Sequence, residues 1–253
     1  MRISLRLCSA VVLLAIICAS ATAVAEEIKV FSVNGVKSVV SKLAPEFQAA
    51  SGDRVQITFA TIGALQEKMA AGEVPDVFIA ISPAITKAEE QGKLVTGSIV
   101  EVGRTGVGIA IKQGAAVPDV STPKKLRRAV LNAKALIYSN PQSGAASGVA
   151  FAQVLEKLGI AEQVKNKTTL TTGSVGELLV EGKGDFGAQQ MSELLPVKGI
   201  VVRPLPAALQ TVTIYRAAVL KQSQKQQSAA AFIKFITSPE AVRKFQAGGF
   251  GKY

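Results

Sequence analysis

Residues 28–60 read IKVFSVNGVKSVVSKLAPEFQAASGDRVQITFA and contain a complete strand–helix–strand unit. The apolar run at 28–33 predicts one strand, and the alternation of apolar and polar residues at 55–60 predicts a second. Between them, residues 36–50 place valine, leucine and phenylalanine side chains on one helical face. Pro45 is expected to kink or split this helix. Two strands joined through a helix indicate a parallel sheet.

The rest of the chain repeats this rhythm. Val77-Phe78-Ile79-Ala80-Ile81 is a continuous apolar run, which is typical of a parallel strand buried on both faces. Further strands are expected at 106–112, 135–139, 168–172, 186–190 and 212–219, and further helices at 62–71, 85–91, 123–133, 148–158, 175–181, 227–236 and 239–246. The pattern predicts an α/β protein with one early and one central sheet, the last strand returning to the first sheet.

The first 25 residues have the pattern of a secretory signal peptide. Arg2 and Arg6 precede an apolar run that is too short to span a bilayer, and Ala23-Val24-Ala25 supplies the small residues expected at a cleavage site after Ala25. Ala21-Thr22-Ala23 offers a second cleavage site, and an uncleaved N-terminal anchor is the other alternative. We expect a periplasmic protein of 228 residues once the 25 are removed.

The composition excludes several classes of function. The chain has no His, and both cysteines, Cys8 and Cys18, lie in the expected signal peptide. An imidazole base, a thiolate and a disulfide are therefore excluded, and we expect no metal site and no cofactor. Loss of Arg2 and Arg6 lowers the formal net charge from +11 to +9, which favours an anionic partner. The dense basic run at 124–128 lacks interleaved aromatic residues, so we expect no nucleic-acid partner.

Small and hydroxyl residues gather where the expected helices begin. Asn34-Gly35 follows the first strand, Thr61 and Gly63 follow the second, and the loops 140–148 and 171–174 precede two later helices. Backbone N–H groups at a helix N-terminus favour an anion, and in open α/β sheets ligands bind at this edge. Ordinary helix capping explains any one of these loops. Four loops divided between two sheets indicate a shared anion-binding cleft.

Four segments carry a family resemblance: IKVFSVNGVKSVVSKLAPEFQAASG, ALQEKMAAGEVPDVFIAIS, SGVAFAQVLEKLG and FIKFITSPEAVRKFQAGGF. Their order resembles the periplasmic molybdate-binding proteins of ABC importers and their wider relatives, from Ile28 to about Phe250. The resemblance implies a type 2 periplasmic-binding-protein fold with two lobes, each a mainly parallel sheet flanked by helices, and a cleft between them. Lobe one would comprise 26–106 plus 212–253, and lobe two 107–211. The implied partners are a small anionic ligand and an ABC permease in the inner membrane, and we expect a monomer.

The expected ligand contacts depart from the pattern of the molybdate binders. Those proteins place hydroxyl side chains after the first and second strands, where this chain has Gly35 and a single hydroxyl at Thr61. Their second-lobe tyrosine falls at about Gln190, and Ser147 and Val175 occupy loop positions that offer backbone amides. The resemblance therefore implies a retained cleft in which the grip on a tetrahedral oxyanion is lost.

Arg104 is the expected carboxylate clamp, since a guanidinium can donate two parallel hydrogen bonds to a carboxylate. The segments Arg104–Gly108, Ser143–Gly148 and Gln190–Pro196 resemble a divergent subgroup whose ligands are mostly unassigned. An exposed hinge arginine is the alternative reading of Arg104. The candidate ligand-binding residues are Asn34, Gly35, Thr61, Gly63, Arg104, Thr105, Ser143, Ser147, Val175, Gln189 and Gln190.

The sequence thus predicts a periplasmic solute-binding protein that takes a small anion, a carboxylate rather than molybdate, for ABC import. An enzyme is the alternative from another class. Some proteins resembling this family isomerise unsaturated tricarboxylates such as aconitate in the periplasm, and the same cleft would hold the substrate while a side chain moves a proton. The spacing of the residues singles out no catalytic base.

Overall fold

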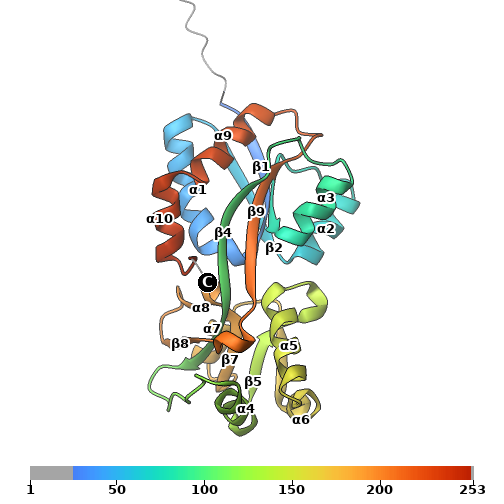
Figure 1. Ribbon diagram of the computed structural model, residues 1–253. Coiled ribbons are helices and arrows are strands. Elements are labelled where there is room, and N and C mark those ends of the chain that lie inside the picture. Colours follow the sequence, from blue (N-terminus) through green and yellow to red (C-terminus); the bar gives the residue numbers. More distant parts are fainter. Residues whose placement is uncertain (1–24, 252–253) are drawn as a thin grey trace, which may run out of the picture.

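The computed structural model describes residues 25–251, and Figure 1 shows two α/β halves stacked end to end. The strands are β1 (Glu27–Val33), β2 (Arg54–Ala60), β3 (Val77–Ile81), β4 (Val100–Lys112), β5 (Leu136–Ser139), β6 (Thr168–Thr171), β7 (Phe186–Gln190), β8 (Ile200–Pro204) and β9 (Val212–Val219). The α-helices are α1 (Lys37–Ser51), α2 (Ile62–Ala70), α3 (Ser82–Glu90), α4 (Pro123–Asn132), α5 (Ala146–Lys157), α6 (Ala161–Val164), α7 (Val175–Val180), α8 (Met191–Leu194), α9 (Gln226–Ile236) and α10 (Pro239–Ala247).

The expected signal peptide, residues 1–25, lies outside the described residues except for Ala25. Within residues 25–251, none of the helices combines the length and the apolar character that crossing a membrane requires.

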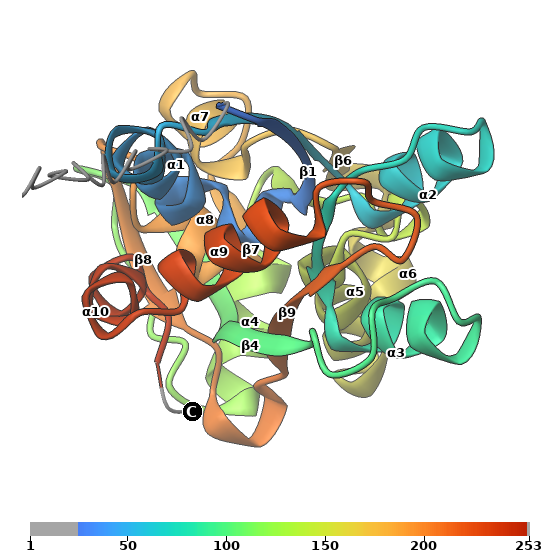
Figure 2. The ribbon, with the colours of Figure 1, turned by 90° about the horizontal axis from the view of Figure 1, so that it is seen from above.

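The first half of the molecule is built from β1, β2, β3, β9 and the start of β4. β1 pairs in parallel with β2 and β3, and β3 pairs antiparallel with β9. Helices α1, α9 and α10 lie on one side of this sheet and α2 and α3 on the other (Figure 2). A single hydrophobic core fills this half, in which the ring of Phe47 meets that of Phe232 edge to face at 5.2 Å.

The second half contains the end of β4 together with β5 to β8. β5 pairs in parallel with β6 and β7, whereas β4 pairs antiparallel with β7 and β8. A core that includes Leu126, Phe151 and Phe186 packs beneath α4, α5 and α6, and a smaller cluster around Val175, Leu179 and Leu194 lies under α7 and α8.

Two long strands connect the halves, and Figure 1 shows β4 and β9 running side by side between them. β4 pairs with β9 from Val100 to Gly106 and then with β7 and β8 from Val107 onward. The complete strand order is β2-β1-β3-β9-β4-β7-β5-β6, with β8 on β4. The sheet is therefore mixed and curled rather than mainly parallel, because the chain passes from the first half to the second on β4 and comes back on β9, which runs in the opposite direction.

Most expected elements occur at their expected places, with some differences. β4 begins at Val100, ahead of the glycine-rich segment that marked it, and β8 and the short helices α6 and α8 have no counterpart in the sequence prediction. The helix α1 also runs through Pro45 without a break. Pro45 lies on the exposed side of α1, while Leu43 and Phe47 anchor the buried side.

Candidate functional site

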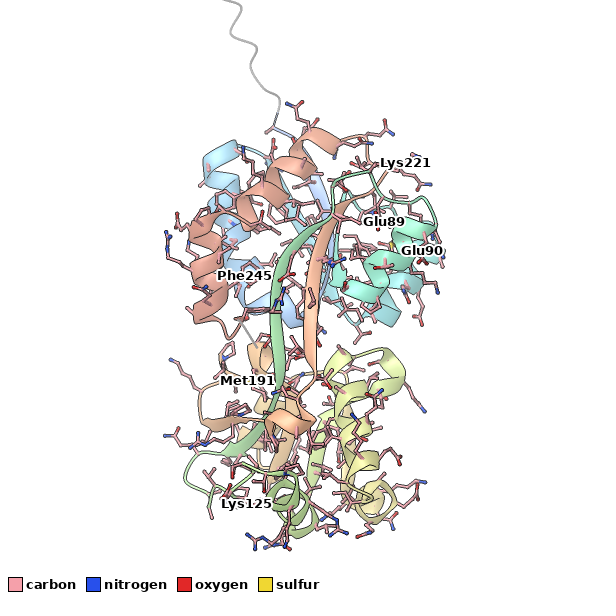
Figure 3. All side chains as sticks on the ribbon, viewed as in Figure 1. Glu89, Glu90, Lys125, Met191, Lys221 and Phe245 are labelled. Atoms are coloured by element: carbon pink, nitrogen blue, oxygen red, sulfur yellow. The ribbon has the colours of Figure 1, made fainter. Side chains whose placement is uncertain are left out.

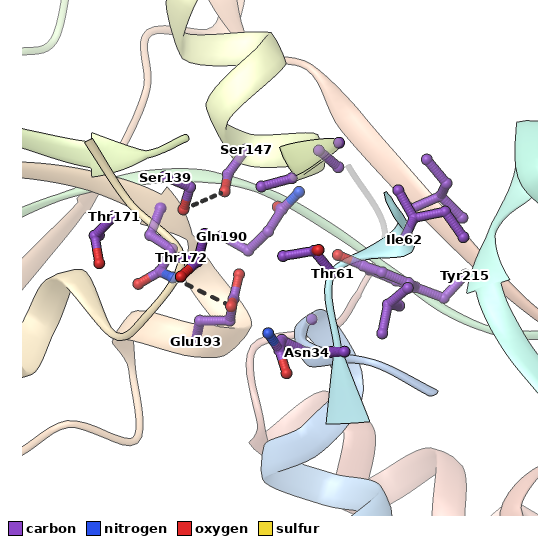
Figure 4. Close-up of a pocket in the computed structure, with 18 residues that line it drawn as sticks. Asn34, Thr61, Ile62, Ser139, Ser147, Thr171, Thr172, Gln190, Glu193 and Tyr215 are labelled. Carbon is purple, nitrogen blue, oxygen red and sulfur yellow. Dashed lines mark hydrogen bonds between the residues drawn. The ribbon is translucent and has the colours of Figure 1, made fainter. Parts of the chain in front are cut away.

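A pocket that opens to solvent lies at the junction of the two halves (Figure 4). It lies at the carboxyl ends of the parallel strands, where Val33, Ala60 and Ile81 end strands of the first half and Ser139 and Gln190 end strands of the second. Open α/β sheets bind ligands at this edge. The lining residues are Val33, Asn34, Gly35, Ala60, Thr61, Ile62, Ile81, Ser139, Gly144, Ala145, Ala146, Ser147, Thr171, Thr172, Gln189, Gln190, Glu193 and Tyr215.

The N-terminus of α5 forms one wall of the pocket. The residue before it, Ala145, makes no side-chain capping hydrogen bond, whereas Thr61 caps α2 by accepting from the amide of Ala64 at 3.4 Å. The first amides of an α-helix have no partner within the helix and carry the positive end of its dipole. Ser147, in the first turn of α5, donates from its hydroxyl to Ser139 Oγ at 3.2 Å. This wall therefore presents hydrogen-bond donors to an anion.

Gly148 sets how closely α5 approaches β5. A Cβ atom at this position would lie 2.1 Å from the carbonyl oxygen of Ser139, closer than any side chain tolerates. Glycine therefore lets the first turn of α5 rest directly on the end of β5, which brings Ser147 to the pocket.

Tyr215 of β9 reaches the pocket beside Gly35. A Cβ atom on Gly35 would lie 2.2 Å from the hydroxyl oxygen of Tyr215, so the tyrosine hydroxyl fills the space that a side chain at position 35 would take. Tyr215 is buried, and burial together with the nearby charge of Glu193 raises the pKa of its hydroxyl well above 10. This hydroxyl stays protonated and able to donate. The Tyr215 hydroxyl from β9 thus occupies the space beside Gly35 at the pocket.

Glu193 is the acidic side chain of the pocket. It lies in the first turn of α8, where its Oε1 accepts from Gln189 Nε2 at 3.2 Å. Burial raises the pKa of its carboxyl from 4.5 to about 7, against a smaller opposing effect of the Gln190 backbone amide. With this pKa, Glu193 can both hold and release a proton near neutral pH. Figure 3 places Met191, which begins α8, at the junction of the halves.

The two neighbouring glutamines have different roles, because successive residues of a strand point to opposite faces. Gln189 accepts from the amide of Val175 at 2.9 Å and donates to the carbonyl of Gly173 at 3.2 Å, so it fixes the start of α7. Gln190 donates from Nε2 to Thr213 Oγ1 at 2.8 Å, while its buried Oε1 has no hydrogen-bond partner.

The structure brings six of the eleven candidate residues to the pocket: Asn34, Gly35, Thr61, Ser147, Gln189 and Gln190. The other five lie elsewhere. The amide of Val175 is taken by Gln189, and the hydroxyl of Ser143 donates to the carbonyl of Asn140 at 2.7 Å. Gly63 faces the backbone of Ser143, at 3.0 Å from a Cβ built on the glycine, and so contributes a close contact between the halves rather than a pocket wall.

Arg104 and Thr105 lie outside the pocket. The Arg104 guanidinium pairs with Glu101, with Nη2 at 2.6 Å from Oε1, on an exposed surface beside α10. A bulge in β4 between Glu101 and Gly103 shifts the alternation of side chains, which allows residues three apart to meet on one face. Thr105 is buried and donates to the carbonyl of Gly249 at 2.9 Å. Neither reaches the wall that the pocket presents to a ligand.

Two central pocket residues were missed in the sequence. Glu193 follows Gln190 by three residues, which is the spacing of a helix cap and its reciprocal acidic partner, and this pattern could have placed it at a helix start near the cleft. Tyr215 lies within an alternating strand of the first half, and its sequence context gives no sign that it reaches the cleft.

Solved structures and relatives define the class of this protein. The periplasmic molybdate-binding protein of Azotobacter vinelandii superposes with a TM-score of 0.75 over 89% of this chain and 99% of that chain, at 21% sequence identity. The fold is therefore the type 2 periplasmic-binding-protein fold. An aconitate isomerase of a Pseudomonas species is 27% identical over 228 residues, which cover 87% of this chain and 86% of the relative. The Azotobacter vinelandii molybdate-binding protein ModA is 25% identical over 236 residues, 90% of each chain.

The model of the bacterial extracellular solute-binding protein family matches residues 28–251. The chain belongs to this family, and its similarity to the molybdate-binding proteins confirms the resemblance found in the sequence.

Proposed function

We propose that this protein is a periplasmic receptor that binds a small carboxylate in the junction pocket and delivers it to an ABC permease of the inner membrane. The observation that carries the proposal is the wall formed by the N-terminus of α5, with the hydroxyls of Thr61, Ser147 and Tyr215 nearby. Backbone amides and hydroxyls are donors suited to oxygen anions.

The charges around the pocket favour a carboxylate over a tetrahedral dianion. Among the described residues that line it, none is Lys or Arg, and one is the acidic Glu193. Within this wall a dianion such as molybdate would meet the carboxyl without a compensating cation, because Lys37 and Lys42 line the adjoining hollow instead, and the cost grows with the charge of the ligand. A single carboxylate group carries less charge, and a protonated Glu193 can donate a hydrogen bond to it.

The paired strands β4 and β9 suggest how binding is transmitted. We place lobe one at 26–106 plus 212–253 and lobe two at 107–211, so that these strands form the hinge. A ligand that contacts both lobes favours the closed state by its higher affinity for that state, and the closed form would dock on the permease.

Calorimetric titration with a panel of small carboxylates, molybdate, tungstate and sulfate tests the ligand class. We expect at least one carboxylate to bind in the micromolar range or tighter and the inorganic dianions to bind far more weakly. Thr172→Val removes a hydroxyl of the pocket wall and should weaken binding, whereas Thr169→Val, on the exposed part of β6, should not. Tight molybdate binding without carboxylate binding would refute the proposal.

A second candidate function is isomerisation of an unsaturated tricarboxylate, which Glu193 specifically favours. A carboxyl with a pKa of about 7 suits general acid–base catalysis near neutral pH. Glu193 would take a proton from a CH₂ group next to a carboxylate and return it to the far allylic carbon, which moves the double bond without net change in composition. The similarity to an aconitate isomerase supports testing this reaction.

The enzyme candidate is tested by NMR after incubation with cis- and trans-aconitate in D₂O. Interconversion with deuterium incorporation, lost in Glu193→Gln, would establish it. Intact substrates after prolonged incubation with the native protein would eliminate it and leave the receptor.

A further inference from the structure

The side-chain amide of Gln190 has a buried acceptor without a partner in the pocket wall. Gln190 ends β7, is 1% exposed and lines the pocket. Its Nε2 is fixed by donation to Thr213 Oγ1 of β9 at 2.8 Å. Its Oε1 is buried and has no hydrogen-bond partner, which distinguishes it among the buried side-chain nitrogen and oxygen atoms of residues 25–251.

A buried acceptor without a donor is unfavourable, and folded proteins satisfy nearly all such groups. Here the unpaired atom belongs to a residue that lines the same pocket as Ser147 of α5, and both are labelled in Figure 4. The group that satisfies it therefore has to enter from the pocket and has to be a hydrogen-bond donor.

We propose that the solute is a small carboxylic acid that also carries a hydroxyl or ammonium donor, and that this donor bonds to Gln190 Oε1 while the carboxylate lies at the N-terminus of α5. The inference rests on the proposed binding of a carboxylate and adds the second group that the ligand must present. The pocket thus recognises two features of one molecule: a carboxylate that accepts hydrogen bonds and a second group that donates one.

When it is ionised, Glu193 is a second acceptor in the pocket wall, and its one described donor from a side chain is Gln189 Nε2, at 3.2 Å. An anion with acceptor atoms only leaves Gln190 Oε1 unpaired and adds a further negative group beside Glu193. A hydroxy acid or amino acid avoids the first cost and reduces the second. Sites that bond a ligand hydroxyl reject the analogue that lacks it, because the buried partner is then left unpaired.

Matched pairs of acids test the inference by calorimetry on the native protein. L-malate and succinate differ by one hydroxyl, L-lactate and propionate likewise, and L-aspartate supplies the ammonium donor. We expect at least one donor-bearing acid to bind roughly 10- to 100-fold more tightly than its partner without the donor. The comparison of malate with aspartate then identifies which donor is preferred.

Two variants assign the discrimination to Gln190. Gln190→Met removes the acceptor at similar side-chain length and should bring the affinity ratio within each pair close to one. Thr213→Ser is the control, because it keeps the hydroxyl that holds Nε2 and with it the position of Oε1, so the ratio should persist. Circular dichroism and thermal melting verify that both variants fold.

Equal affinities within every pair for the native protein would overturn the inference while leaving the carboxylate proposal intact, and this result needs no variant. An unchanged ratio in Gln190→Met would overturn it as well. Binding of neither member of any pair, with tight binding of an inorganic dianion, would refute both proposals together.

Discussion

Replacing Gly35 by alanine should damage both folding and binding, because one atom would be added where Tyr215 already lies. The new Cβ would lie 2.2 Å from the tyrosine hydroxyl oxygen, 2.6 Å from Cζ and 2.9 Å from Cε1. Tyr215 cannot easily withdraw, since it is 2% exposed and its ring packs edge to face on Phe250 at 6.0 Å. Overpacking of this kind costs about 1–3 kcal/mol, which in a chain of this size lowers Tm by roughly 2–12 °C.

Any shift of Tyr215 that relieves the clash would move its hydroxyl away from the position it has in the pocket. Loss of one hydrogen bond to a ligand weakens binding by about tenfold. Thermal melting and calorimetry with the best carboxylate measure the two effects. Gly173→Ala is a matched control near the same pocket, because its Cβ would meet only Thr171 Oγ1 at an ordinary 3.5 Å. This control should lower neither Tm nor affinity measurably.

A double-mutant cycle with Tyr215→Leu identifies the source of the effect. If the clash with the tyrosine ring is responsible, Gly35→Ala should cost far less in the Tyr215→Leu background than in the native one. Equal costs in the two backgrounds, or a Gly35→Ala protein as stable as the native one, would refute the explanation based on this contact.

Three further perturbations test the charged residues. Because the folded-state pKa of Glu193 lies above its usual value, the folded protein holds this proton more tightly. The associated stability, up to about 3 kcal/mol, should be present below pH 4.5 and lost as pH rises through about 7. Melting curves from pH 4 to 8 should show this slope for the native protein and a flatter one for Glu193→Gln. Arg104→Ala should leave carboxylate affinity unchanged and lower the free energy of unfolding by at most about 1 kcal/mol, since Arg104 makes an exposed ion pair with Glu101. A loss of carboxylate binding in calorimetry would instead support Arg104 as a residue that binds the carboxylate. Asp76→Ala should cost about 2–4 kcal/mol in urea unfolding, because the buried carboxylate accepts from the Lys29 amide at 2.7 Å and from Ser223 Oγ at 2.6 Å; a change below 1 kcal/mol would contradict this role.

The fold could be predicted because local patterns and one geometric rule are sufficient for it. The buried strand at 77–81 and the returning strand at 212–219 occur at the expected bounds. Strands that are parallel end at one edge, so residues after separate strands, such as Asn34 and Thr61, could be brought together without knowledge of the contacts. β8 was not predicted from the sequence, because its residues continue directly from the preceding loop and their pairing with β4 depends on tertiary structure.

The candidate site was predicted less well, since side-chain direction is not a property of spacing. Arg104 was selected for the chemistry of its guanidinium, but a bulge in β4 and an adjacent Glu101 direct it to the surface. Tyr215 reaches the pocket only because Gly35, far away in sequence, leaves room for its hydroxyl. The sequence shows that position 35 has no side chain, and the structure shows that the Tyr215 hydroxyl occupies the free space.

The crossing of the chain through β4 and β9 has a consequence for the order of assembly. β3 pairs on one side with β1 and on the other with β9, which lies more than a hundred residues later. The half that spans residues 107–211 is contiguous, whereas the other half must close a loop of that length before its sheet is complete. Closure between distant segments slows folding. We therefore expect the middle of the chain to become ordered first, with the apolar edge of β3 left open until the last third of the sequence returns to cover it.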